Sequence, residues 1–317
     1  MKKVILSSIV AVALSGTLLA DETKTQAPAP AKTEATTQAP APAKASNATS
    51  KEVSSNALNS AKSDATAQKG EIKVIQEAVD AVKLTQEVVI LLDKNDKENA
   101  VKSLEKAIGK LEVVLSNPKA PALIPLSANV VVSEFAGSAM DAENAIITAT
   151  ALLEKHKVQA ARAIVVGLRD EIDFVTVNLP LASYPAALKL AAKFLHEDKV
   201  VEAKKVLLTA LNTFVEVNVV TPIGIIEAQS LIQAASKVAK NDKDLALSHL
   251  EAAKRALKKS EVLGYVSTSD TTYKMLSDAI NEIEKEIRGK NEAGKLFDEL
   301  IEKIKEFKEK AVKSITK

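Results

Sequence analysis

The chain lacks several residue types that common functional sites require. Its 317 residues include no cysteine, no tryptophan, three histidines and nine glycines. Without cysteine, disulfides, thiolate-bound zinc, iron–sulfur clusters and thiol catalysis are excluded. So few glycines leave little material for loops that cradle phosphates, and the GxGxxG, Walker A and GxSxG motifs are absent. Aromatic residues make up only 3% of the chain, so platforms for stacking bases or sugars are scarce.

An excess of charge of one sign is lacking as well. The chain carries 43 basic and 41 acidic residues, and Lys2 and Lys3 account for the difference. A balanced charge provides no electrostatic attraction to a phosphate backbone. We therefore expect no nucleic-acid partner.

The histidines give no sign of a metal centre. His156 and His196 lie at predicted helix elbows and His249 on a predicted helix, and no two of them have metal-ligand spacing. We interpret them as exposed side chains. We expect no metal, no cofactor and no catalytic residue, and hence a protein that is not an enzyme.

One acidic cluster needs an explanation. Asp170, Glu171 and Asp173 follow a predicted helix closely, and we place them at its end. A divalent ion there would relieve the repulsion between the carboxylates and the helix dipole. A solvated cluster beside Arg169 is the simpler interpretation, and we prefer it.

The N-terminus has the features of an export signal. A basic start, MKK, precedes an apolar run that ends near Leu19, and a polar segment follows Ala20. This pattern predicts a signal peptide over residues 1–20 and export to a bacterial periplasm, without stable membrane insertion after cleavage. The alternative is an uncleaved N-terminal anchor, since the apolar run is at the short end for spanning a bilayer.

The next segment has the composition of a spacer. Residues 21–69 are rich in Ala, Pro, Thr, Lys and Ser, and they repeat TQAPAPAK at positions 25–32 and 37–44. Alternating Ala-Pro favours an extended, semi-rigid chain. Too few large apolar side chains are present to offset the entropy of ordering. We predict a disordered tether, with a weak helix as the alternative over residues 50–69.

From Glu71 onward the chain reads as helix. Its main residue types, apart from Val and Ile, are strong helix formers, and the apolar spacing is helical. We assign residues 71–268 to a helical body and residues 269–317 to a C-terminal helical hairpin. Apolar residues of the second half of that hairpin alternate four and three positions apart: Ala293, Phe297, Leu300, Ile304, Phe307 and Ala311. Such a seam packs either on the body or on a second chain.

A repeated unit recurs in the body. An apolar residue is followed by a charged elbow and, eight positions on, by the first small residue of a second helix. The pairs are Leu92 and Ala100, Leu152 and Ala160, Leu195 and Ala203, and Val238 and Ala246. Small residues allow helices to approach closely, so each unit is predicted to be an antiparallel αα-hairpin. Duplication and convergence explain the pattern equally well.

Two hairpins are followed by strand-like phrases, FVTVN at 174–178 and FVEVN at 214–218, and each soon meets a proline. A third such run spans residues 130–135. Proline restricts the preceding residue to extended conformations, so these runs are either apolar connectors covered by helices or short paired strands. The predicted fold is mainly α: antiparallel helical hairpins packed as a bundle or short array, with two or three short extended, β-like connectors.

The connectors supply the candidate binding site. Polar-tipped side chains and prolines gather there, and we predict a shared groove from Phe174, Asn178, Pro180, Tyr184, Pro185, Phe214, Asn218, Thr221 and Pro222. In the simpler alternative, the polar groups among them only satisfy the connector backbone by hydrogen bonding.

Three stretches of the body carry a resemblance to a known family. They are FVTVNLPLASYPAALKLAAKFLHEDKVVEAKKVLLTALNTFVEVNVVTP, IPLSANVVVSEF, and VVILLDKNDKENAVKSLEKAIGKLE. They resemble the bacterial YfdX family over about residues 71–265, and the tether and C-terminal hairpin extend beyond its shorter members. The resemblance implies an exported, mainly helical, often oligomeric protein without an established enzymatic activity. It also implies a link with envelope and acid stress, and a chaperone-like or small-molecule-binding role.

Together these observations favour a non-enzymatic, periplasmic, stress-associated protein. We expect it to bind client proteins or partners through apolar helical surfaces and to form a homo-oligomer. The alternatives are a small apolar ligand held between the two FV-x-VN connectors and a structural scaffold of the envelope.

Overall fold

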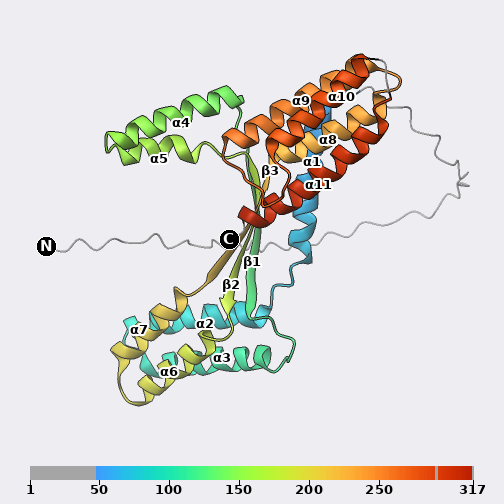
Figure 1. The fold of residues 1–317 in the computed structure, drawn as a ribbon. Helices are drawn as coiled ribbons and strands as arrows, with labels where there is room; N and C mark the ends of the chain where they lie inside the picture. Colours follow the sequence, from blue (N-terminus) through green and yellow to red (C-terminus); the bar gives the residue numbers. More distant parts are fainter. Residues whose placement is uncertain (1–47, 290–291, 316–317) are drawn as a thin grey trace, which may run out of the picture. The chain divides into compact units, whose positions relative to one another are not determined.

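Helices dominate the structure, and the mainly α fold is confirmed. The structure is a computed structural model that describes residues 48–289 and 292–315 (Figure 1). The described elements are α1 (Ser50–Glu71), α2 (Gln76–Asp93), α3 (Lys97–Leu115), β1 (Leu123–Ser133), α4 (Ala139–Glu154), α5 (Val158–Val166), β2 (Glu171–Pro180), α6 (Tyr184–His196), α7 (Val200–Leu211), β3 (Val215–Pro222), α8 (Ile223–Val238), α9 (Lys243–Val262), α10 (Tyr273–Arg288) and α11 (Gly294–Ile315). The predicted signal peptide and the TQAPAPAK repeats lie outside the described residues.

The two strand-like phrases belong to neighbouring strands of one sheet. β1, β2 and β3 form an antiparallel sheet with β2 in the centre. Phe174 pairs with Val219 and Asn178 with Val215, so the phrases run antiparallel to each other. On its other edge β2 pairs with β1, where Val130 faces Phe174. This pairing satisfies backbone groups that isolated connectors would leave without partners.

Proline sets the ends of the strands. Pro180 and Pro222 are the last residues of β2 and β3, where the missing N–H weakens the ladder least. Pro125 lies in β1 beside a shift of register that precedes Ser127. Pro222 is also the N-cap of α8, so the chain passes from sheet to helix without a loop.

The four predicted hairpins form as α2–α3, α4–α5, α6–α7 and α8–α9. Three elbows contain a residue with positive φ, namely Asn95 (59°), His156 (55°) and Asp198 (58°). Asn, Asp and His are the non-glycine residues that most often adopt this conformation. In the fourth hairpin the helices approach closely at Gly224, where an added Cβ would lie 2.6 Å from the carbonyl oxygen of Ala256.

The helices share two large apolar cores. One is enclosed by α2, α3, α6 and α7, and the other by α8, α9, α10 and α11. The C-terminal seam is buried in the second core, with Phe297 and Leu300 each 1% exposed. The seam therefore packs on the body, the first of its two predicted partners. The hairpin of α10 and α11 thus shares a core with α8 and α9.

Helix α1 covers a smaller apolar cluster. Ile172, Ile223 and Ile226 pack against Ala57 and Leu58 of this helix. No residue of α1 is itself buried, so the helix adds little apolar burial of its own. Because residues 50–71 form a helix with a capping box at Thr49, the helix alternative holds for this part of the predicted tether, and the disordered interpretation is wrong there.

Candidate functional site

The residues of the predicted groove are divided between the sheet and the first core. Six of them lie in β2 and β3: Phe174, Asn178, Pro180, Asn218, Thr221 and Pro222. Asn178 is buried, and its Nδ2 donates to the Val215 carbonyl and to Oγ1 of Thr176, both at 3.1 Å. Asn178 therefore satisfies groups of the sheet itself, as in the simpler alternative.

Tyr184 packs in the core. It is fully buried and stacks on Phe214 with ring centroids 5.8 Å apart. Burial raises the pKa of Tyr184 to about 12. Thr85 of α2 lies near the Tyr184 hydroxyl and opposes this rise only in part, because no well-formed hydrogen bond from that hydroxyl exists among the described residues. Pro185 is buried beside it in the first turn of α6, so these residues fix the start of α6.

The remaining groove residues lie elsewhere. Burial raises the pKa of the Asp173 carboxyl, and the nearby Asn218 side chain opposes this rise only in part. Thr221 lines a cavity of about 400 Å³ between α1 and α8. The other eight predicted residues line neither this cavity nor three others found among the described residues. The structure thus brings Tyr184 to Phe214, but it does not gather all nine residues around one hollow.

A buried cluster of charges joins the sheet to α9. Oδ1 of Asp170 accepts a hydrogen bond from the Phe135 amide at 3.1 Å, and its Oδ2 lies 2.8 Å from Nζ of Lys259. The Tyr265 hydroxyl accepts from the Asp170 amide at 2.9 Å and donates to Glu171 at 2.8 Å. The cluster therefore ties the end of β1, the start of β2 and the last turns of α9.

The prediction that these carboxylates are solvated at a helix end is wrong. Helix α5 ends before them, and Glu171 and Asp173 share one face of β2, because side chains of a strand alternate. Asp170, Glu171 and Asp173 are all buried. Arg169 pairs with Glu171 at 2.6 Å and with Asp173, so these charges are compensated inside the fold.

Burial disfavours negative charge in this region. Burial, with repulsion from Glu171, raises the pKa of Asp173. On α8, burial raises the pKa of Glu227, and the positive charge of Lys259 opposes this only in part. No group of three or more His, Asp or Glu side chains in the described residues is arranged to hold a metal ion. The contacts of the cluster therefore join β1, β2 and α9.

The expectation of exposed histidines is wrong for His249. This residue is 1% exposed, and its Nδ1 lies 2.9 Å from the Ser50 hydroxyl at the start of α1. Burial lowers the pKa of His249. His156 and His196 are exposed as predicted.

The α4–α5 hairpin leaves a set of large apolar side chains exposed to solvent. Each is between 37% and 70% exposed: Met140, Ile146, Ile147, Leu153, Val158, Val165 and Val166. We call these seven residues the α4–α5 face. Only Ala142 and Ala149 of α4 and Ala161 of α5 are buried. The hairpin therefore holds together through small residues and turns large ones outward.

The exposure follows from the neighbours of the hairpin. The main neighbours of α4 are α5 and α9, and the main neighbour of α5 is α4 (Figure 1). By contrast, α2–α3 packs on α6–α7, and α8–α9 packs on α10–α11. Ala160, which the repeat places at a helix interface, is exposed. The fourfold pattern thus predicts the hairpin correctly but not its surroundings.

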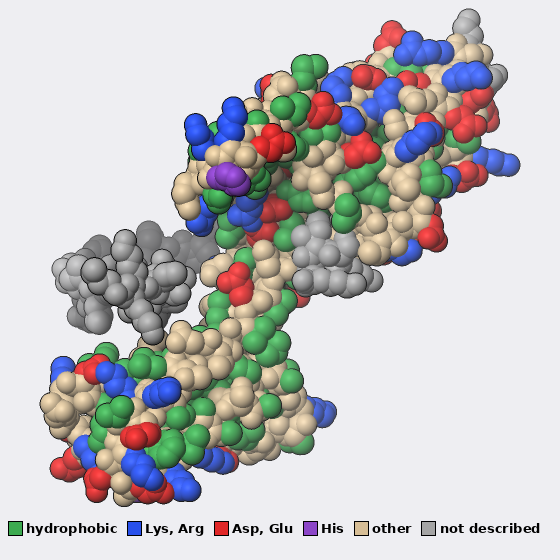
Figure 2. Space-filling view, turned by 60° about the vertical axis from the view of Figure 1, so that its left-hand side comes forward, with side chains coloured by type: hydrophobic (Ala, Val, Ile, Leu, Met, Phe, Trp, Pro, Cys, Tyr) green, Lys and Arg blue, Asp and Glu red, His purple; other side chains and the backbone are tan. Residues whose placement is uncertain are grey.

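A sequence signal for this face exists and was missed. Residues 144–153, NAIITATALL, contain no charged residue. An exposed helix normally carries charged or polar side chains on its outer face. Elsewhere, on the side seen in Figure 2, positive and negative side chains are interspersed over the surface. This uncharged stretch lies wholly within one helix and carries exposed apolar side chains, and the α4–α5 face is our candidate functional surface.

Comparison with known proteins identifies one family. A family model described as YfdX protein matches residues 81–220. A solved structure of Salmonella Typhi YfdX has 17% sequence identity and a TM-score of 0.33, and the match covers 46% of this chain and 91% of that one. No curated protein matches the chain.

Proposed function

The chain is a YfdX-family protein through its residues 81–220, and we propose that it is a non-enzymatic, exported protein that binds unfolded client polypeptides. The observation that carries this proposal is the α4–α5 face. An exposed apolar surface of this kind marks an interaction site. Its seven side chains lie on one hairpin, so an extended client segment can contact several of them at once.

The energetics fit reversible capture. Full burial of a Val, Leu, Ile or Met side chain contributes roughly 1.5–3 kcal/mol. The side chains of the α4–α5 face are already partly covered, so each contributes roughly 1 kcal/mol when a client covers it. All seven contacts together contribute roughly 7 kcal/mol, and the cost of ordering the client reduces this, so the affinity of one face is weaker than about 10 μM. That strength suits a protein that must release its clients.

The charges around the α4–α5 face do not select clients by the sign of their net charge, so apolar content decides which segments bind. Asp141 and Glu143 lie in the first turns of α4, and Lys155 and Lys157 lie in the elbow. The two ends are therefore oppositely charged. Unfolded segments of either net charge find a complementary end.

We assign binding rather than catalysis because the charged groups of the buried cluster serve to join elements of the fold. The Asp170–Lys259 pair and the Arg169 pairs hold elements together. Export is part of the proposal and rests on the sequence of residues 1–20. No helix within residues 48–289 and 292–315 is long and apolar enough to cross a membrane. The stress association rests on the family.

The test uses the chain from Asp21 onward with reduced insulin as the aggregating client. The reductant leaves this chain unchanged because it has no cysteine. The test variant carries Ile147→Ser and Val166→Ser. Its matched control carries Val201→Ser, which changes a valine of α7 that is 78% exposed. Client aggregation is followed by light scattering, and the mass of the protein alone is measured in parallel.

We expect the wild type and the control to suppress aggregation. Removing about 1 kcal/mol at each of two positions should weaken the apparent affinity of the double variant about thirtyfold. Equal suppression by all three proteins, or none by the wild type, would contradict the proposal. A smaller mass for the double variant with unchanged suppression would also contradict it, because a second copy of the chain would then cover the face.

A further inference from the structure

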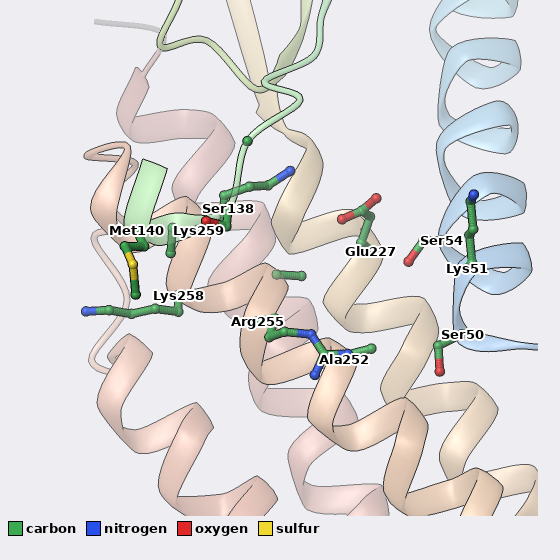
Figure 3. Close-up of a pocket in the computed structure, with 13 residues that line it drawn as sticks. Ser50, Lys51, Ser54, Ser138, Met140, Glu227, Ala252, Arg255, Lys258 and Lys259 are labelled. Carbon is green, nitrogen blue, oxygen red and sulfur yellow. The ribbon is translucent and has the colours of Figure 1, made fainter. Parts of the chain in front are cut away.

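A second feature of the surface shares only Met140 with the α4–α5 face. An open cavity of about 580 Å³ lies where α1, α8, α9 and the start of α4 meet (Figure 3). Four basic side chains line it: Lys51, Arg255, Lys258 and Lys259. Glu227 is the one acidic residue among the lining residues. We call this cavity the basic hollow.

The walls of the basic hollow are apolar beneath these charges. Ala252, Arg255, Ala256 and Lys259 line it from α9. Their spacing of three and four residues places them on one stripe of the helix. Met140, which is 70% exposed, contributes its flexible thioether side chain from α4. The hollow therefore combines an apolar floor with cationic side chains.

Two of the basic residues are already engaged and two are available. Lys259 pairs with the buried Asp170 at 2.8 Å, and Lys258 pairs with Glu261 at 3.1 Å. In Figure 3 the Lys258 side chain points away from Glu227. Arg255 has one long contact, 3.5 Å to Glu251, and Lys51 makes no ion pair with any residue in the described ranges.

The arrangement carries a cost that an anion would relieve. Arg255 is three and four residues from Lys258 and Lys259, and like charges at these spacings destabilise a helix. Guanidinium groups bind carboxylates and similar anions through paired hydrogen bonds. An anion beside Arg255 would therefore gain such bonds and reduce the repulsion along α9.

We propose that the basic hollow binds an anionic amphiphile. The anionic headgroup lies beside Arg255, and the hydrocarbon body covers Ala252, Ala256 and Met140. The alanines leave space for a chain, and the thioether adapts to its shape. Glu227 opposes the anion when it is ionised, but burial raises its pKa and so favours its neutral form.

The experiment measures binding by titration calorimetry with decanoate, below its micelle concentration, and with 1-decanol as the neutral counterpart. A third arm uses vesicles of phosphatidylglycerol, which present an anionic headgroup on a membrane. The test variant is Arg255→Gln, and the matched control is Arg288→Gln, an exposed arginine of α10. Far-UV circular dichroism and melting temperature confirm that each variant folds.

We expect decanoate to bind about tenfold or more tightly than decanol. Arg255→Gln should weaken decanoate binding about tenfold, Arg288→Gln should leave it unchanged, and Glu227→Gln should strengthen it. Equal binding of decanoate and decanol, or an unchanged Arg255→Gln variant, would overturn the proposal. Binding to vesicles without binding of decanoate would overturn it in favour of a membrane surface. Loss of decanoate binding in Ile147→Ser/Val166→Ser would place the ligand on the α4–α5 face and also overturn it.

Discussion

The pair formed by Asp170 and Lys259 allows a quantitative test of how the sheet is held to α9. The Asp170 side chain is 2% exposed and that of Lys259 17%. Replacing Lys259 by Met keeps most of its volume but leaves the Asp170 carboxylate without its cation. Asp170 would retain the hydrogen bond from the Phe135 amide at 3.1 Å, which compensates only part of the loss.

The magnitude follows from the burial of the pair. Removing one partner of a fully buried ion pair costs about 3–5 kcal/mol. Because Lys259 keeps some contact with water, we expect Lys259→Met to lower the free energy of unfolding by about 2–4 kcal/mol. The neighbouring Lys258 is 56% exposed and pairs with the exposed Glu261. Lys258→Met should therefore cost at most about 0.5 kcal/mol.

The assay is urea unfolding at pH 7, followed by far-UV circular dichroism, with the slope of the transition compared between variants. The double variant Lys259→Met with Asp170→Asn removes both charges. It should recover about 2 kcal/mol relative to the sum of the two single variants. If Lys259→Met is no more destabilising than Lys258→Met, the pair does not hold the sheet to α9 and our interpretation of the cluster is wrong.

Three further predictions concern packing and pH. Gly109→Ala should raise the free energy of unfolding by about 0.5–1 kcal/mol, since nothing lies within 4 Å of the added Cβ. Gly224→Ala should lower it by about 1–3 kcal/mol, because α8 and α9 would be forced apart. Urea midpoints of the two variants that move in the same direction would contradict this. Tyr184→Phe should change the free energy of unfolding by less than about 1 kcal/mol, because the buried hydroxyl makes no well-formed hydrogen bond in the described part of the chain. Tyr184→Ala should cost about 3–5 kcal/mol. A large loss of stability in the phenylalanine variant would contradict this and reveal a hydrogen bond of the hydroxyl. Burial raises the pKa of Glu227 above its unfolded value of about 4.3, so the contribution of Glu227 to stability falls as the pH rises through the folded pKa. Glu227→Gln should therefore be more stable than the wild type above that pKa and equal to it below about pH 4. A stability difference that grows in acid would show that Lys259 stabilises the ionised form.

Much of the fold could be predicted from local patterns. The elbows that contain Asn95, His156 and Asp198 could be located from the sequence because each is a charged, polar segment between two helical apolar patterns. The strand phrases were recognised by their alternation and by Pro180 and Pro222. Their pairing was an open alternative, because the partner of a strand lies far away in the sequence.

The site was harder to predict because burial is decided by tertiary packing. Asn178 and Tyr184 have the same polar tips whether they line a groove or support a core. Only the pairing of β2 with β3 and the stacking of Tyr184 on Phe214 decide between these roles. The sequence around His249 predicts only a helix, and its burial depends on contact with α1, which lies far away in the sequence. The α4–α5 hairpin has the same sequence pattern as its three counterparts, and only its lack of a second packed hairpin leaves its large apolar side chains exposed.

The central claim is that an unfolded client binds the α4–α5 face. Hydrogen–deuterium exchange of the full chain from Asp21, with and without reduced insulin, tests it most directly. The account predicts that amides of residues 139–166 become protected when the client is present, while those of α7 around Val201 stay unchanged. Protection confined to other elements, or none under conditions where the client stays soluble, would contradict the account.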